Sequence, residues 1–118
     1  KYSSKDRKIN SLRIQNFCKY MDKNGFNVIC SIQSIFPKDQ KKNRKLFSKY
    51  FQVHLKADKQ DLIQRNNKRI YSKKKDVVGK DIKFPKPYRS NYEIKNKFNN
   101  SLNLHVNKIV KKIYAKLQ

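Results

Sequence analysis

The sequence has few residues of several kinds, and each shortage excludes a class of protein. It contains only two glycines and two cysteines, and no G-x-x-x-x-G-K-[ST] phosphate-binding pattern occurs in it. Cys18 and Cys30 form no C-x-x-C motif and have no neighbouring histidine, so neither a disulfide framework nor a zinc site is expected. There is also no apolar run of about eighteen residues, so no membrane-spanning helix or signal-peptide core is predicted.

Acidic residues are scarce as well. Eight Asp and Glu stand against thirty-one Lys and Arg, which gives a formal net charge of +23. A compact chain with this charge repels itself, so a polyanionic partner is expected. The charge is spread along the whole chain, which favours nucleic acid over an anionic membrane, because a membrane would select one basic amphipathic helix.

No arrangement of catalytic residues is apparent. The eight acids are scattered, and no Ser/His/Asp or phosphate-loop pattern occurs. His54 and His105 have no second metal ligand at a suitable spacing. The sequence therefore predicts no enzyme, no cofactor and no metal, although a metal-dependent nuclease built from distant Asp residues stays open as an alternative.

The first clear apolar pattern is helical. Its members recur at i, i+3, i+4 and i+7, and they are Ile14, Phe17, Cys18 and Met21. Gly25 is suited to the left-handed conformation that ends many helices. A helix over 8–24 is therefore predicted.

Strand-like alternation follows this helix. Apolar and polar residues alternate over 28–36 and again over 47–55. This period of two predicts two strands. Pro37 is expected to end the first of them, and 38–45 is expected to form a charged turn.

Weaker patterns fill the C-terminal half. A further strand is indicated over 64–69, and 73–87 is expected to be a proline-marked loop. Ser90 and Glu93 have the spacing of a capping box, which predicts a short second helix. The alternating residues of a last predicted strand are Leu102, Leu104 and Val106. Helical spacing returns over 109–117.

These residues resemble the tenth protein of the small ribosomal subunit, a universal family. In that family a helix opens near an Asp and ends in a glycine before a strand. The residues that match these positions are Asp6, Ile9, Phe17, Gly25 and Val28. Residues 35–38 resemble the proline-marked step of the family, 51–55 the next strand, and 56–60 the tip of a loop that penetrates rRNA.

The later part of the chain extends the resemblance. The residues that resemble the return strand are Leu62, Arg65, Asn66, Asn67, Lys68, Arg69 and Ile70. Residues 90–108 resemble the closing helix and strand. The proline motif is reduced and the loop tip is shorter than in the family, which puts the RNA contacts of the tip in doubt more than the fold.

The resemblance implies an α+β fold. We expect a small split β-α-β, ferredoxin-like antiparallel sheet with two helices, whose first strand is truncated to a stub at 1–4. A single RNA-binding domain is predicted over 1–108, with a C-terminal helical extension over 109–118. The basic loops of this domain are predicted at 37–45, 56–61 and 72–89.

Basic residues in two clusters are the predicted RNA contacts. They are Lys38, Lys41, Lys42, Arg44, Lys45, Lys56, Lys59, Arg65, Lys68 and Arg69. Arg65 and Arg69 stand out, because a guanidinium can form a bidentate hydrogen bond with a phosphate or stack on a base. Lysines outnumber arginines, so most contacts are expected to reach backbone phosphates.

The predicted function is that of a structural constituent of the small ribosomal subunit. The expected partners are rRNA and neighbouring ribosomal proteins, with no membrane and no small-molecule substrate. The absence of an initial Met indicates that an N-terminal segment has been removed or is not included in the sequence. A mitochondrial location is predicted, with the cytoplasmic ribosome as the alternative. A basic accessory subunit of another organellar complex and a general nucleic-acid-binding protein are the competing functions.

Overall fold

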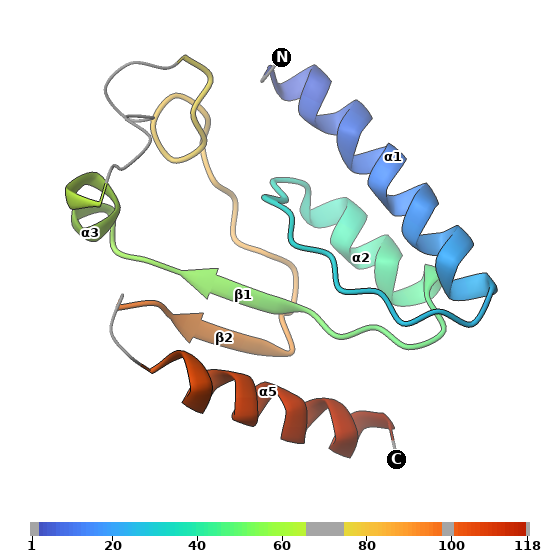
Figure 1. Cartoon of the computed structure of the whole chain (residues 1–118). Coiled ribbons are helices and arrows are strands. Elements are labelled where there is room, and N and C mark those ends of the chain that lie inside the picture. The colour runs from blue at the N-terminus through green and yellow to red at the C-terminus, as the bar shows by residue number, and fades with distance from the viewer. Residues whose placement is uncertain (1–2, 66–74, 98–100, 118) are drawn as a thin grey trace. The chain divides into compact units, whose positions relative to one another are not determined.

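The computed structural model describes residues 3–65, 75–97 and 101–117. The chain divides into two compact units, both visible in Figure 1. Unit 1 contains Lys1–Tyr50 and Lys68–Tyr88, and unit 2 contains Phe51–Asn67 and Arg89–Gln118. Each unit therefore joins two separate stretches of the chain, so neither unit is a simple half of the sequence.

Helix α1 (Ser4–Lys23) opens unit 1 and confirms the predicted first helix, although it begins four residues earlier than expected. Ser3 caps the helix, because its side chain accepts a hydrogen bond from the Asp6 backbone N–H at 3.2 Å. Gly25 follows the helix with φ of +79°, the left-handed conformation that glycine adopts without strain.

Helix α2 (Pro37–Leu46) replaces the predicted basic loop over 37–45, which is wrong. Pro37 was expected to end a strand, but it occupies the first turn of a helix, where its missing N–H costs nothing. The lysines and Arg44 that follow are good helix formers. α1 and α2 lie side by side in Figure 1, and Gln15 Nε2 on α1 donates to Asn43 Oδ1 on α2 at 2.5 Å.

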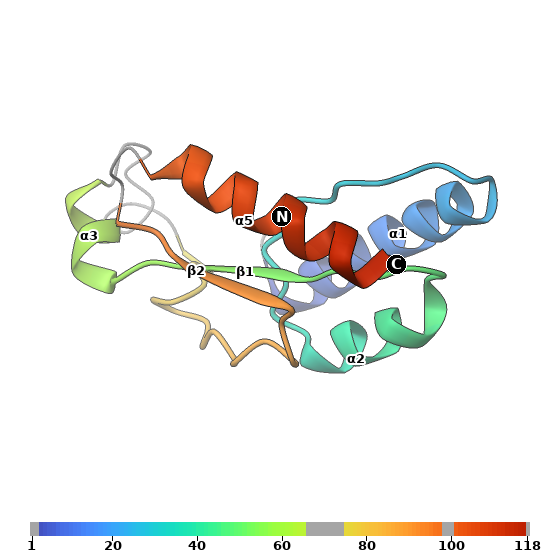
Figure 2. The same cartoon turned by 90° about the horizontal axis from the view of Figure 1, so that it is seen from below.

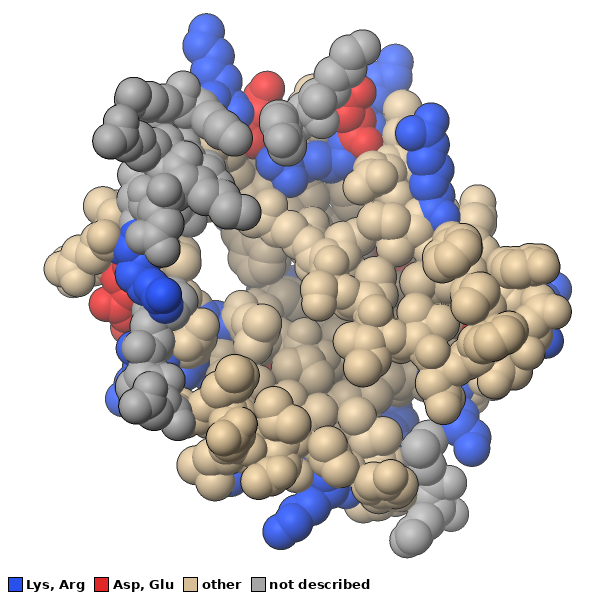
Figure 3. Space-filling view, in the orientation of Figure 1, with Lys and Arg blue, Asp and Glu red and all other residues tan. Residues whose placement is uncertain are grey.

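The segment 26–36 runs back along α1 (Figures 1 and 2). It is extended, as its alternation indicated, but the predicted strand is wrong, because no strand of the described residues pairs with it. Residues 24–37 carry no charged side chain, and Ile29 is 99% exposed. In Figure 3 uncharged side chains cover the right of the molecule, with lysines and arginines at the edges.

The apolar core of unit 1 is small. Its buried apolar members are Ile35, Val77 and Val78. A tight loop after Asp76 holds the two valines in place, since the Val77 carbonyl accepts from the backbone N–H groups of Asp81 at 2.8 Å and Ile82 at 3.0 Å. This irregular loop agrees with the loop predicted for this part of the chain.

Unit 2 is built on two parallel strands, β1 (Val53–Lys56) and β2 (Tyr92–Lys95). The register pairs Val53 with Tyr92 and Leu55 with Ile94, and Ile94 is the buried apolar residue of this unit. This parallel α/β arrangement contradicts the predicted antiparallel, ferredoxin-like α+β fold. The prediction failed because a period of two indicates an extended chain but not the direction of its neighbour.

Two helices complete unit 2. α3 (Lys59–Gln64) begins inside the predicted loop 56–61, and the residues after 65 in the predicted strand 64–69 lie outside the described residues. α5 (Leu102–Leu117) replaces the predicted last strand and continues across residues 108 and 109, where the extension was expected to begin. Lys112 Nζ lies 5.7 Å from the centre of the Tyr92 ring, which places α5 against the sheet.

Local signals misled the sequence interpretation in unit 2. Ser90 and Glu93 were predicted to cap a helix, but Glu93 lies in β2 and pairs across the sheet with Lys56. Leu102 and Val106 are four residues apart, which fits a helix as well as the alternation of a strand. None of the described helices is long and apolar enough to cross a membrane.

Candidate functional site

Polar side chains in unit 1 form a network that joins four segments of the chain. Arg7, in the first turns of α1, is the first residue of this network. The Arg7 guanidinium donates to Gln33 Oε1 and to the Asp76 carbonyl, each at 3.1 Å. Asp76 has φ of +58°, a left-handed conformation that Asp tolerates better than most residues. Arg7 is thus held from two sides by segments remote in sequence.

Lys8 is the second cation of the network. Its ammonium lies 2.6 Å from both carboxylate oxygens of Asp39, in the first turn of α2. The Asp39 side chain is only 8% exposed, whereas that of Lys8 is 40% exposed. Lys8 Nζ also lies 4.8 Å from the centre of the Phe36 ring. This ion pair fixes the start of α2 against α1 and neutralises a buried carboxylate.

Gln40 is a buried polar residue that extends the network to the loop after Asp76. Its Nε2 donates to Ser34 Oγ at 3.2 Å, and its Oε1 accepts from the Tyr88 backbone N–H at 2.6 Å. Lys41 Nζ lies 6.0 Å from the centre of the Tyr88 ring. Each buried polar group of Gln40 therefore has a partner, which makes this end of unit 1 well defined.

The network can recognise an anion. Arg7 and Lys8 are adjacent on one helix. The partner of Lys8, Asp39, is buried, whereas the partners of Arg7, Gln33 and Asp76, are exposed and come from two other segments of the chain. A cation that is held in this way keeps its geometry before a ligand arrives, and charge-assisted hydrogen bonds to phosphate or sulfate are about twice as strong as neutral ones. The arrangement thus suits the positioning of a phosphate- or sulfate-bearing molecule.

A second polar cluster lies on the sheet of unit 2. Glu93 on β2 is bonded to Lys56 and lies 3.4 Å from His54 Nδ1, both on β1. The hydrogen bond from Lys56, and then that from His54, lowers the pKa of Glu93 below its ordinary value. Lys95 and Asp58 form a further ion pair at 3.2 Å. These exposed pairs join neighbouring elements of unit 2.

The structure disperses the predicted RNA-binding residues over several elements. Those on α2 are Lys38, Lys41, Lys42, Arg44 and Lys45. Lys56 ends β1, Lys59 begins α3, and Arg65 follows α3. Lys68 and Arg69 lie outside the described residues. The expected second cluster at a loop tip is therefore not formed by the described residues of that group.

The sequence interpretation missed the residues of the unit 1 network. They are Arg7, Lys8, Gln33, Ser34, Asp39 and Gln40. One signal was present: Asp39 is one of only eight acids, and only Lys38 separates it from the uncharged stretch that ends in Pro37. An acid in this position is a candidate for burial against a cation. Among the described residues, no group of three or more His, Cys, Asp or Glu is placed to hold a metal ion.

Helices flanking a parallel sheet are consistent with a P-loop kinase fold, and comparison with known proteins identifies the family. A profile of the adenylylsulphate kinase family matches residues 1–95, so the chain belongs to this family. Cytidine diphosphoramidate kinase of Campylobacter jejuni is 33% identical over 108 residues, which cover 87% of this chain and 63% of that protein. The chain thus spans less than two thirds of this relative. No solved structure matches it.

This family overturns the ribosomal interpretation. The resemblance to the tenth small-subunit protein is wrong, and so are the predictions of rRNA and ribosomal partners, of no enzyme and of no small-molecule substrate. The charge of +23 indicates affinity for anions in general and does not specify RNA. The matched positions mark a helix, a glycine and an extended segment, an order that unrelated folds share. The mitochondrial location stays a prediction.

Proposed function

We propose that the chain takes part in phosphoryl transfer from a nucleoside triphosphate to a small acceptor, and that unit 1 recognises an anionic group of the acceptor. The observation that supports this most directly is that the Arg7 and Lys8 network lies entirely within the residues that match the kinase family. Phosphoryl transfer depends mainly on positioning and on electrostatic stabilisation, which fixed cations provide.

Binding of the phosphate donor requires groups other than those of the Arg7 and Lys8 network. The loop that cradles ATP phosphates in P-loop kinases has the pattern G-x-x-x-x-G-K-[ST], which is absent from these 118 residues. No group of three or more His, Cys, Asp or Glu within the part of the chain that the structure describes is placed to hold a metal ion. We therefore assign the Arg7 and Lys8 network to the acceptor side of the reaction.

The names of the family and of the relative indicate the class of acceptor. Adenylylsulphate and cytidine diphosphoramidate are both nucleotide anions. We infer that the acceptor of this chain is a nucleotide-linked anion. Arg7, fixed by Gln33 and by the Asp76 carbonyl, is the residue proposed to contact its phosphate or sulfate group.

Calorimetric titration with adenylylsulphate and with CDP, each added separately, tests this assignment. The matched variants are Arg7→Gln and Arg13→Gln, which remove the same charge from the same helix. Arg7→Gln should weaken binding by about tenfold to a hundredfold, the loss expected for a hydrogen bond to a charged group. Arg13→Gln should leave it unchanged. If the parent chain bound neither nucleotide, or if both variants lost affinity equally, the acceptor assignment would fail.

A further inference from the structure

A groove between α1 and α2 is separate from the Arg7 and Lys8 network. Its volume is about 330 Å³. Its lining residues are Gln15, Asn16 and Lys19 of α1 and Lys42, Lys45 and Leu46 of α2. The network contains residues from the first turns of both helices, whereas these residues come from later turns. The groove therefore needs an explanation of its own.

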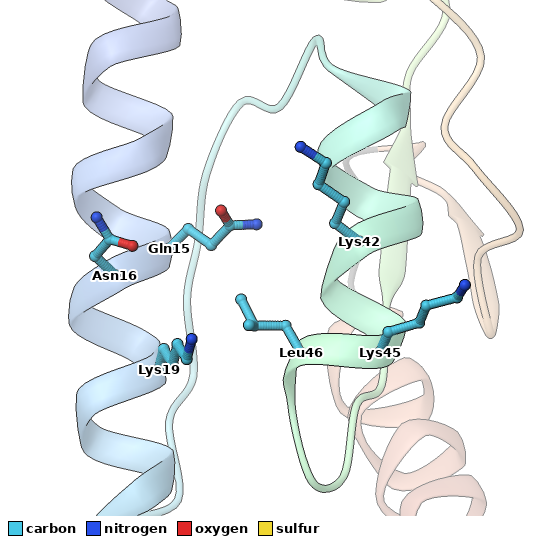
Figure 4. A pocket seen from close by; sticks show the side chains of 6 residues that line it. All are labelled: Gln15, Asn16, Lys19, Lys42, Lys45 and Leu46. Atoms are coloured by element: carbon cyan, nitrogen blue, oxygen red, sulfur yellow. The ribbon is translucent and has the colours of Figure 1, made fainter.

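The side chains that line this groove include three lysines and one leucine, and the Gln15 amide already donates to Asn43. Figure 4 shows Lys19 and Gln15 directed from α1 toward α2, and Lys42 and Leu46 directed from α2 toward α1. Lys45 extends away from α1, so the aliphatic part of its side chain lines the edge of the groove. The lining includes no carboxylate. The Lys19 and Lys42 ammonium groups thus lie at different levels of the groove, with the side chains of Gln15 and Leu46 between them in the view of Figure 4.

The acids of the two helices are already engaged elsewhere. Asp39 binds Lys8, and Asp22 accepts from the Ser48 backbone N–H at 3.0 Å and from its hydroxyl at 2.7 Å. Asp6 accepts from the Ser3 hydroxyl at 2.7 Å. Within the described part of the chain, neither Lys19 nor Lys42 forms an ion pair with a carboxylate. Their charges are therefore not compensated by the acids of α1 and α2.

We propose that this groove binds the phosphate or pyrophosphate group of a small molecule between Lys19 and Lys42. An anion with more than one negative charge relieves the repulsion between the two ammonium groups and accepts their hydrogen bonds. The volume of the groove is at the lower end of small-ligand sites. This site does not depend on the proposed acceptor function, because no residue of the network lines it.

Titration with inorganic pyrophosphate, followed by calorimetry and by backbone amide shifts, tests the site. Lys19→Gln/Lys42→Gln is compared with Lys5→Gln/Lys38→Gln, which also removes one lysine from each helix and leaves the same net charge. The parent should bind at one saturable site and shift the amides of Asn16 and Leu46. The groove variant should bind about tenfold more weakly or worse, and the control should remain within about twofold.

The same titration with ADP distinguishes two sources of the ligand. Loss of both pyrophosphate and ADP binding in the groove variant assigns the groove to a nucleotide, and loss of pyrophosphate binding alone assigns it to the inorganic anion. Arg7→Gln should leave the pyrophosphate-induced shifts of the Asn16 and Leu46 amides unchanged, which separates this site from the acceptor site. Equal weakening in the groove variant and its control, or no saturable binding by the parent, would overturn the proposal.

Discussion

The Asp39 carboxylate is the buried charge of unit 1, and it depends on Lys8. Replacing Lys8 by Met keeps a flexible apolar stem near Phe36 but removes the ammonium that lies 2.6 Å from Asp39. Because Lys8 is partly exposed, the loss in the free energy of unfolding should be about 1–3 kcal/mol, below the range for fully buried pairs. Urea unfolding measures this loss in the free energy of unfolding. Lys5→Met on the same helix is the control, and an equal loss in both variants would contradict the expectation.

Glu93 should make unit 2 sensitive to acid. Lys56 and His54 lower its pKa in the folded state, so as pH falls the unfolded chain takes up a proton first. The contribution of Glu93 is therefore complete above the ordinary pKa of glutamate, about 4.3, and is lost as pH falls through the lower folded value. Urea midpoints measured down to about pH 3 should decline less steeply in Glu93→Gln than in the parent.

Asp22 limits the expected difference in acid sensitivity between the Glu93→Gln variant and the parent. Hydrogen bonds from the Ser48 backbone N–H and hydroxyl lower the pKa of Asp22 as well, so it contributes acid sensitivity in the same direction. The Glu93→Gln variant should therefore keep part of the pH dependence. Identical profiles for the variant and the parent would show that the interaction across β1 and β2 does not form in solution.

At the scale of elements, α1 ends because Gly25 can adopt a left-handed conformation. An added Cβ at Gly25 would meet no atom within 4 Å, so Gly25→Ala tests the backbone alone. At φ of +79° the substitution should cost about 1–2 kcal/mol of unfolding free energy. Gly25→Asn should cost less, since Asn tolerates this region. Thermal unfolding ranks the three proteins, and equal stability of the two variants would contradict this account.

The uncharged segment 26–36 is an extended chain with an exposed apolar surface. Such a segment is a template for association with other chains once charge repulsion is screened. Ile29→Lys should change the free energy of unfolding by no more than about 0.5 kcal/mol, because Ile29 is 99% exposed. It should also reduce self-association in about 1 M salt, as measured by sedimentation velocity.

Asn27→Lys is the control for this effect. It adds the same charge to the same exposed segment but removes no apolar surface. If the two variants suppressed association equally, net charge rather than the Ile29 side chain would be responsible.

Some elements could be predicted from the sequence because local spacing determines them. Helix α1 has a helical apolar stripe and a glycine stop, so it was predicted. The basic run after Pro37 was misassigned because a proline either ends one element or begins the next. Glu93 was misassigned because its strand forms by pairing with β1, whose residues Lys56 and His54 lie far away in sequence.

The candidate site was missed for the same physical reason. Gln33 is 26 residues from Arg7, Asp39 is 31 residues from Lys8, and Asp76 is 69 residues from Arg7. Charge counting detects clusters along the chain, such as that on α2, but not cations that are fixed by distant partners. Only the fold brings these residues together.

For the molecule as a whole, the formal charge of +23 should make stability depend on ionic strength. Salt screens the repulsion between cations, and the screening length falls from about 30 Å at about 0.01 M to about 3 Å at about 1 M. The melting temperature should therefore rise over this range, measured by circular dichroism. Sodium and potassium chloride should act equally, and a falling melting temperature would show that attractive pairs such as Lys8–Asp39 outweigh the repulsion.

The parallel pairing of β1 with β2 has a consequence for synthesis of the protein. The paired residues His54 and Glu93 are 39 positions apart, and a parallel ladder cannot close through a tight turn. While a nascent chain emerges from the ribosome, α1 can already be complete, but β1 cannot pair with β2 until residues 92–95 have been translated. The pairing of β1 with β2 is therefore delayed, and this delay is set by connectivity rather than by the stability of the strands.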